Sequence, residues 1–101
     1  MIDGIEQKIG ENTFIVPPLN FKGIKKLLKL LDQLQKAPHG TDEQFDLMCD
    51  VVLIGLQRNY PELTRDELEE ILDIENIHPV IEAITGQAGL KKKVIPPVEN
   101  P

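Results

Sequence analysis

Residues 45–56 constrain the fold more strongly than any other part of the sequence. Their spacing predicts a helix with three apolar sides, on which only Glu43, Asp46, Asp50 and Gln57 form a strongly polar strip. The apolar residues are Phe45, Leu47, Met48, Cys49, Val51, Val52, Leu53, Ile54 and Leu56. A helix that is apolar on three sides must be covered on three sides. We therefore expect this helix at the centre of the fold or of an oligomer.

Residues 21–36 predict a basic amphipathic helix. Its apolar stripe is Ile24, Leu27, Leu28, Leu31 and Leu34, and its opposite side carries Lys22, Lys25, Lys26, Lys29 and Lys36. The stripe is expected to face the core, because the rest of the chain needs an apolar wall. A basic amphipathic helix can also fit a partner's groove or lie on an anionic membrane. Leu27, Leu31 and Leu34 are therefore also candidate partner-binding residues.

Local signals predict where the remaining elements begin and end. β-branched and aromatic residues favour a hairpin over residues 5–16, with strands at 5–9 and 13–16. The expected helix caps are Asn20, the Thr41 and Gln44 pair, the Thr64 and Glu67 pair, and Asn76. Gly86 is the expected end of the fourth helix. Gly55 weakens its own helix but allows another helix to approach closely.

Together these elements predict a mainly α fold: a small bundle of about four helices with a short N-terminal β-hairpin. A chain of 101 residues at 41% hydrophobic has enough apolar surface for one core but not for two. We expect a single domain over residues 1–90. Residues 91–101 contain three lysines and three prolines and predict a flexible C-terminal tail.

The net charge of −6 argues against nucleic acid as a partner, because such binding depends on neutralising phosphates with Lys and Arg. The charge is unevenly distributed. Residues 17–40 carry five Lys and one Asp, whereas residues 41–86 carry twelve acids and only Arg58 and Arg65. This complementarity can favour packing of the two halves or self-association.

The sequence offers no convincing catalytic or cofactor chemistry. It has no serine, and its single cysteine, Cys49, falls on an apolar helix face where a buried, unreactive thiol is expected. His39 and His78 are isolated, so no metal site is expected. An unpaired cysteine fits a reducing cytosol, and no stretch has the length of a membrane span. We expect a protein that is not an enzyme, needs no cofactor and does not bind membranes.

Three short strings occur in an order typical of one protein family. Residues 14–20 read Phe-Ile-Val-Pro-Pro-Leu-Asn before a leucine-rich helix, residues 56–64 read Leu-Gln-Arg-Asn-Tyr-Pro-Glu-Leu-Thr, and residues 80–86 read Val-Ile-Glu-Ala-Ile-Thr-Gly. In this order the chain resembles the tail assembly chaperones of long-tailed bacteriophages over about residues 13–90. Relatives often carry a second arginine where this chain has Gln57.

The resemblance implies a protein that binds the long, apolar tape-measure protein and delivers it to tail-tube subunits. It implies a location in the host bacterial cytoplasm and absence from the mature virion. Arg58 and Tyr60, within the second string, are candidate partner-binding residues. Tyr60 has an alternative role in packing against the start of the third helix.

In many members of this family, a ribosomal frameshift near the end of the gene produces a longer form. Lys91, Lys92 and Lys93 stand where such a slip is expected, and they are also candidate partner-binding residues. A basic tail is the equally favoured interpretation of these lysines.

Two other binding functions remain open. One is a structural head–tail connector or head-completion adaptor that stays in the particle. The other is an acidic host-directed regulatory protein that binds through the carboxylates of residues 62–75.

Overall fold

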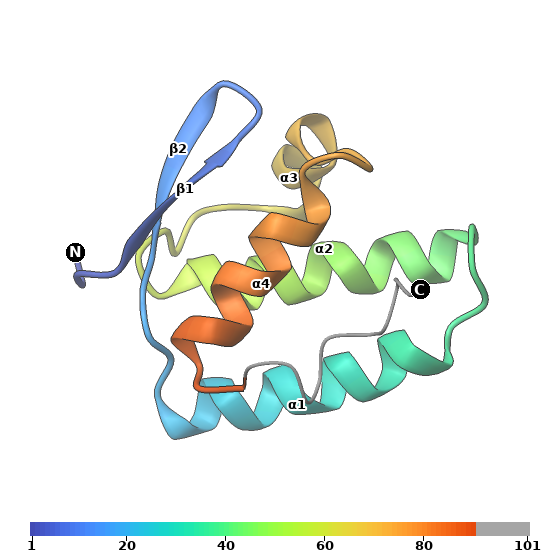
Figure 1. Cartoon of the computed structure of the whole chain (residues 1–101), viewed down its shortest axis with the longest axis horizontal. Helices are drawn as coiled ribbons and strands as arrows, with labels where there is room; N and C mark the ends of the chain where they lie inside the picture. Colours follow the sequence, from blue (N-terminus) through green and yellow to red (C-terminus); the bar gives the residue numbers. More distant parts are fainter. Residues whose placement is uncertain (91–101) are drawn as a thin grey trace.

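The computed structural model describes residues 1–90, so the predicted tail and its three lysines lie outside the described residues. The described chain is mainly helical, as predicted, with an N-terminal hairpin (Figure 1). Its elements are β1 (Ile5–Ile9), β2 (Asn12–Val16), α1 (Phe21–Lys36), α2 (Asp42–Gln57), α3 (Arg65–Ile71) and α4 (Ile77–Gln87).

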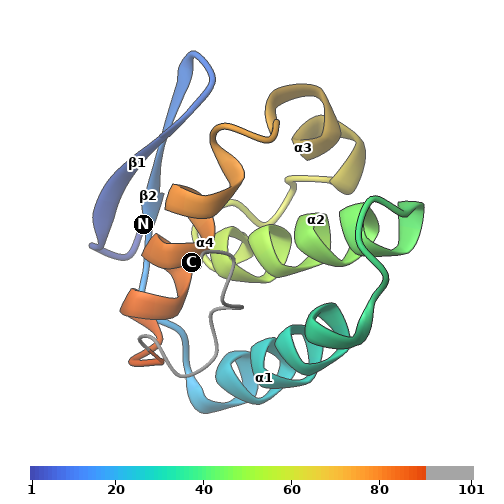
Figure 2. The ribbon, with the colours of Figure 1, turned by 45° about the vertical axis from the view of Figure 1, so that its right-hand side comes forward.

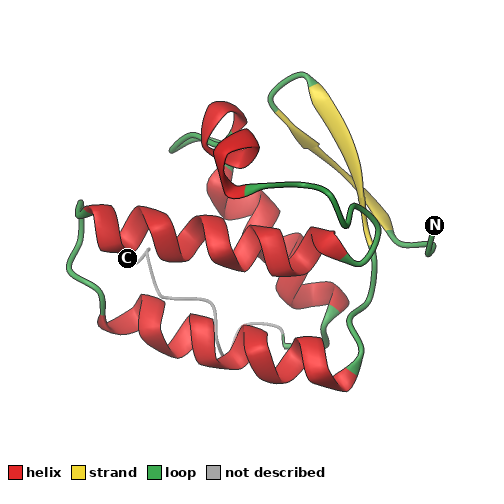
Figure 3. Ribbon diagram, turned by 180° about the vertical axis from the view of Figure 1, so that it is seen from behind, coloured by secondary structure: helices red, strands yellow, loops and turns green. Residues whose placement is uncertain are grey.

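Helix α2 is the centre of the fold. It runs antiparallel to α1, as Figure 3 shows, and it also packs against α3, α4 and β2. Helix α4 lies between α2 and the hairpin and contacts both (Figure 2). Because α4 crosses the pair of long helices obliquely and α3 has only seven residues, the arrangement is a helical hairpin crossed by α4 rather than four aligned helices. One cluster of buried residues joins all six elements.

The hairpin matches the prediction except at its turn. Residues pair from Ile5 with Val16 to Ile9 with Asn12, so β2 begins at Asn12 instead of residue 13. Gly10 permits the tight connection because its φ of 64° lies in the left-handed region, which glycine adopts without a steric penalty. Ile9 and Val16 are fully buried and anchor the hairpin to the core.

Two of the predicted helix starts are confirmed in full. Asn20 Oδ1 accepts a hydrogen bond from the Gly23 amide at 2.8 Å. Thr64 and Glu67 form a complete capping box at α3, because each side chain accepts from the other residue's main-chain amide. At α2 the box is only half formed. Thr41 accepts from the Gln44 amide, but Gln44 Oε1 accepts from the Gly40 amide.

Helix α4 begins after Asn76, as predicted, but the predicted capping bond and the predicted end at Gly86 are wrong. Asn76 makes no capping bond to α4; its side chain accepts from the Asp73 amide and donates to the Ile71 carbonyl, both at 2.9 Å. The helix continues past Gly86 to Gln87. Gly89, with φ of 77°, follows the cap, and the Gly89 and Leu90 amides donate to carbonyls of the last turn. This is a Schellman motif, so the left-handed residue that ends α4 is Gly89.

The basic and acidic halves make no mutual ion pair among residues 1–90. The salt bridges of the described chain join Lys36 to Asp32 within α1 and Arg65 to Asp46 and Asp50 within the acidic half. The lysines of α1 are exposed, and most of the acids between residues 41 and 86 are exposed as well, whereas Asp46 and Asp50 are half-buried beside Arg65.

Candidate functional site

A groove with a volume of about 480 Å³ opens between α2, the end of α3 and the start of α4. Its apolar lining includes Phe45 and Met48 of α2, Leu72 and Ile74 of the α3–α4 linker, and Ile77 of α4. Ile74 is 74% exposed and Phe45 45% exposed, high values for large apolar side chains. The volume falls within the range of roughly 300–1,000 Å³ that is typical of binding pockets.

Two acidic side chains stand among the residues that line the groove. Glu69 and Asp73 line the groove together with His39 and His78, and none of the described residues that line it is Lys or Arg. Asp73 also organises the linker, because its carboxylate accepts from the amides of Glu75 and Asn76 at 2.9 and 2.8 Å. The described lining is therefore largely apolar and carries two carboxylates.

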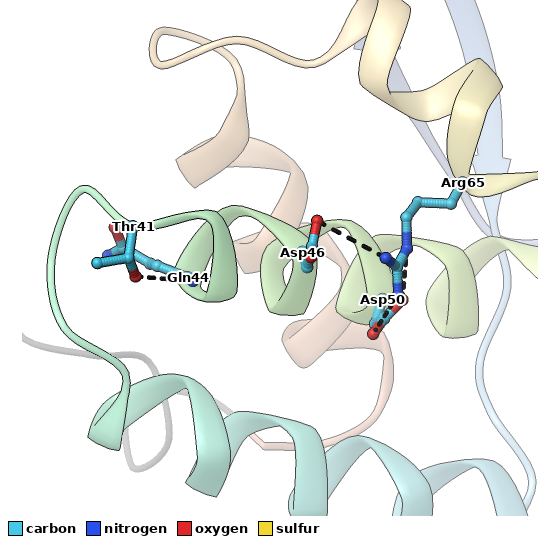
Figure 4. Close-up of polar contacts among 5 residues, drawn as sticks. All are labelled: Thr41, Gln44, Asp46, Asp50 and Arg65. Carbon is cyan, nitrogen blue, oxygen red and sulfur yellow. Dashed lines mark hydrogen bonds and ion pairs between the residues drawn. The ribbon is translucent and has the colours of Figure 1, made fainter.

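Arg65 lies close to this region but its charge is already paired. Its guanidinium donates to both carboxylate oxygens of Asp50 at 2.8 and 3.0 Å and lies 3.6 Å from Asp46 (Figure 4). The hydrogen bonds to Asp50 and the charge of that carboxylate raise the pKa of Arg65. The arginine joins the start of α3 to α2, and among residues 1–90 Glu69 and Asp73 form no ion pair.

Cys49 lies in the lining of the groove and is buried, as the sequence predicted. Burial raises the pKa of its thiol, and the carboxylate of Glu69 raises that pKa further. Because the thiolate is the reactive form, this cysteine is a poor nucleophile at neutral pH. Within residues 1–90, no group of three or more His, Cys, Asp or Glu is placed to hold a metal ion.

The three predicted partner-binding leucines of α1 occupy the core. Leu27, Leu31 and Leu34 are buried in the protein's own interior, so the partner-binding role predicted for them is corrected to a packing role. The α1 stripe turns inward because α2 needs an apolar cover. The exposed apolar residues of α1 are Phe21, at 85% exposure, and Leu28.

Arg58 and Tyr60 hold the N-terminal segment in place. The Tyr60 hydroxyl accepts from the Ile15 amide at 2.8 Å, and its ring packs edge-on against Phe14 at 5.2 Å. Arg58 donates to the Pro18 carbonyl at 2.7 Å. Tyr60 therefore packs against the hairpin, which corrects the predicted packing against the third helix.

Asn59, which sequence reasoning passed over, completes this contact. Its side-chain amide donates to the carbonyls of Ile2 and Ile15, and its Oδ1 accepts from the Ile2 amide at 2.7 Å. The main-chain amide of Ile15 therefore bonds to Tyr60 and its carbonyl to Asn59, and both point away from β1. Covering the outer edge of β2 in this way removes a surface on which another strand could pair.

Comparison with known protein families, curated proteins and solved structures finds no match to this chain. The described residues contain no helix with the length and apolar character needed to cross a membrane.

Proposed function

We propose that this chain is a non-catalytic tail assembly chaperone of a long-tailed bacteriophage. In this role it binds the tape-measure protein and presents it to tail-tube subunits during tail assembly. The order of the three sequence strings supports the family. The strings lie at the end of β2 and in the connection to α1, at the α2–α3 connection, and in α4.

The observation that carries the proposal is the open apolar groove beside α2. A chaperone for an extended helical client needs an accessible apolar surface, a charged exterior and modest affinity. Exposed Ile74 and Phe45 beside Glu69 and Asp73 combine the first two properties.

The proposal includes a cellular location and a set of partners. The protein acts in the host bacterial cytoplasm, leaves the tail before the virion is complete and uses no cofactor. A longer form of the same protein, made by a frameshift near the codons of Lys91 to Lys93, is a further partner. A second copy of the chain is another. The nucleotide sequence tests the frameshift, because a run of adenines and an overlapping downstream frame must both be present there.

Retention of the cognate tape-measure protein by the immobilised full chain tests the function. We expect the immobilised chain to retain the tape-measure protein at micromolar concentration. An unrelated acidic protein, immobilised in the same way, should not retain it. Mass spectrometry of purified virions separates the chaperone from a head–tail connector, because a chaperone is absent from the particle. No retention of the tape-measure protein contradicts the proposal.

Glu69, Glu70 and Asp73 form no ion pair among residues 1–90. They favour one second candidate, an acidic regulatory protein that binds through its carboxylates. Charge reversal at Glu69 and Glu70 abolishes binding in that case, whereas Ile74→Asp has the larger effect for a chaperone. Leu31→Asp cannot make this distinction, because Leu31 is buried and its replacement by a carboxylate unfolds the protein.

A further inference from the structure

The walls of the groove between α2, α3 and α4 determine how a partner can be recognised there. They are helices and a linker, and β1 and β2 contribute none of the residues that line it. An extended segment therefore finds no strand edge with which to form a main-chain ladder. Recognition must rest on side chains that enter the apolar lining, which is how an amphipathic helix binds in a groove.

Charge restricts the partner further. Glu69 and Asp73 line the groove, and Arg65, the arginine of α3, is occupied by Asp46 and Asp50. Lys26 and Lys29 of α1 line a different and more open hollow between α1 and α2. A partner helix with acidic flanks is repelled by these two carboxylates, whereas Lys or Arg flanks gain charge-assisted contacts.

The linker that carries Ile74 is held in place before any partner arrives. Asp73 accepts from two amides that follow Ile74, and the Asn76 side chain bridges back to the Asp73 amide and the Ile71 carbonyl. These bonds keep Ile74 out in solvent, although it is apolar. A contact residue that is already fixed loses little conformational entropy on binding.

We propose that this groove is the docking surface for an amphipathic helix whose apolar stripe is flanked by Lys or Arg. The apolar stripe contacts Phe45, Met48, Ile74 and Ile77, and a flanking cation pairs with Glu69. Identifying the natural source of this helix as the tape-measure protein rests on the proposed function. The docking site itself rests on the groove.

Synthetic peptides test the chemistry without the natural client. The probe is a Leu and Lys peptide of about 18 residues, five helical turns, with its leucines on one face. One control has the same composition in scrambled order, and another replaces Lys by Glu. We expect the amphipathic Leu and Lys peptide to shift the amide NMR signals of the labelled full chain around Phe45, Ile74 and Ile77. The Glu peptide and the scrambled peptide should bind at least about tenfold more weakly, a difference of roughly 1.4 kcal/mol.

Paired variants locate the site. Ile74→Asp removes an exposed groove residue, and Phe21→Asp removes an even more exposed apolar residue on α1, so both chains should fold. We expect Ile74→Asp to weaken peptide binding about tenfold or more and Phe21→Asp to leave it unchanged. The second pair compares two neighbouring acids. Glu69 lines the groove and Glu70 is not among its lining residues, so Glu69→Gln should weaken peptide binding and Glu70→Gln should not. Equal effects within both pairs, or shifts centred on the lysine face of α1, overturn the inference.

A parallel measurement separates this inference from the proposed function. If the wild-type chain retains the tape-measure protein and Ile74→Asp retains it equally well, the groove is not the docking surface although the chaperone function stands. If the peptide binds in the groove but the tape-measure protein is not retained, the docking surface stands and the proposed function is wrong.

Discussion

Gly55 of α2 lies directly against the side chain of Ile84 in α4. A Cβ atom placed on Gly55 would come within 2.5 Å of Ile84 Cγ1 and within 2.6 Å of its Cδ1 and Cγ2 atoms. These distances are shorter than any ordinary van der Waals contact. Gly55 therefore permits the close crossing of α2 and α4, and this crossing positions the start of α4 at the groove.

We expect Gly55→Ala to destabilise the fold, because the added methyl overpacks the crossing at a cost of about 1–3 kcal/mol. Alanine recovers about 1 kcal/mol in a helix interior, so the expected net loss is up to about 2 kcal/mol. Ile84 is β-branched and has few rotamers available in a helix, so a change of its rotamer cannot relieve the clash. Urea unfolding measures the change.

Gly86→Ala is the matched control for this experiment. Gly86 also lies within a helix, but a Cβ placed there meets nothing within 4 Å. We expect it to stabilise the protein by about 0.4–1 kcal/mol. If Gly55→Ala stabilises the protein as much as Gly86→Ala does, the crossing is looser than described.

Tyr60→Phe should destabilise the protein by about 1 kcal/mol. The variant keeps the ring against Phe14 but leaves the Ile15 amide without its acceptor. Amide hydrogen exchange gives the specific readout, since the Ile15 amide should lose protection while the amides of α2 keep theirs. Unchanged protection at Ile15 would show that the ring alone holds the hairpin.

The role of Asn76 can be tested by a substitution that a helix cap tolerates. Serine is as good a cap as asparagine, but it is too short to reach both Asp73 and Ile71. We expect Asn76→Ser to destabilise the protein by about 1 kcal/mol, because two linker bonds are lost. Asn20→Ser, at a true cap, should change the free energy of unfolding by less than about 0.5 kcal/mol. Equal effects of the two substitutions would argue that Asn76 caps α4 after all.

Elements with local signals were predictable from the sequence. The start of α3 follows from Thr64 and Glu67, since both halves of a capping box lie within four consecutive residues. The start of α1 at Asn20 and the strands of the hairpin are equally local. The central position of α2 followed from its three apolar sides, which tertiary packing had to cover.

Features that depend on competition between neighbouring groups or on distant segments were not predictable in this way. Asn76 had the pattern of a cap, but the Asp73 amide and the Ile71 carbonyl compete for its side chain. Tyr60 could not be assigned to the hairpin because its partner, Ile15, is 45 residues away in sequence. The groove combines three segments. The excess of apolar residues at 45–56 indicated one wall, but the placement of Ile74 and Ile77 against it depends on tertiary packing.

Cys49 should react slowly with iodoacetamide in the native protein, and the pH dependence should reveal why. Burial and the nearby Glu69 carboxylate raise the pKa of the thiol, so at a given pH less of the reactive thiolate is present than in the unfolded chain. The folded state favours the neutral thiol. Its contribution to stability is therefore fully present below the pKa of the unfolded thiol and is lost as pH rises through the higher pKa of the folded state.

Mass spectrometry of timed alkylation measures this effect, with the protein unfolded in urea as the reference for a fully accessible cysteine. The half-maximal rate should occur at higher pH in the native protein than in urea. Glu69→Gln removes a charge that raises the pKa of Cys49, so it should speed native alkylation at a given pH. Arg65→Gln removes a charge that lowers this pKa and should slow the reaction. Native alkylation as fast as in urea would show that the thiol is open to solvent and reactive.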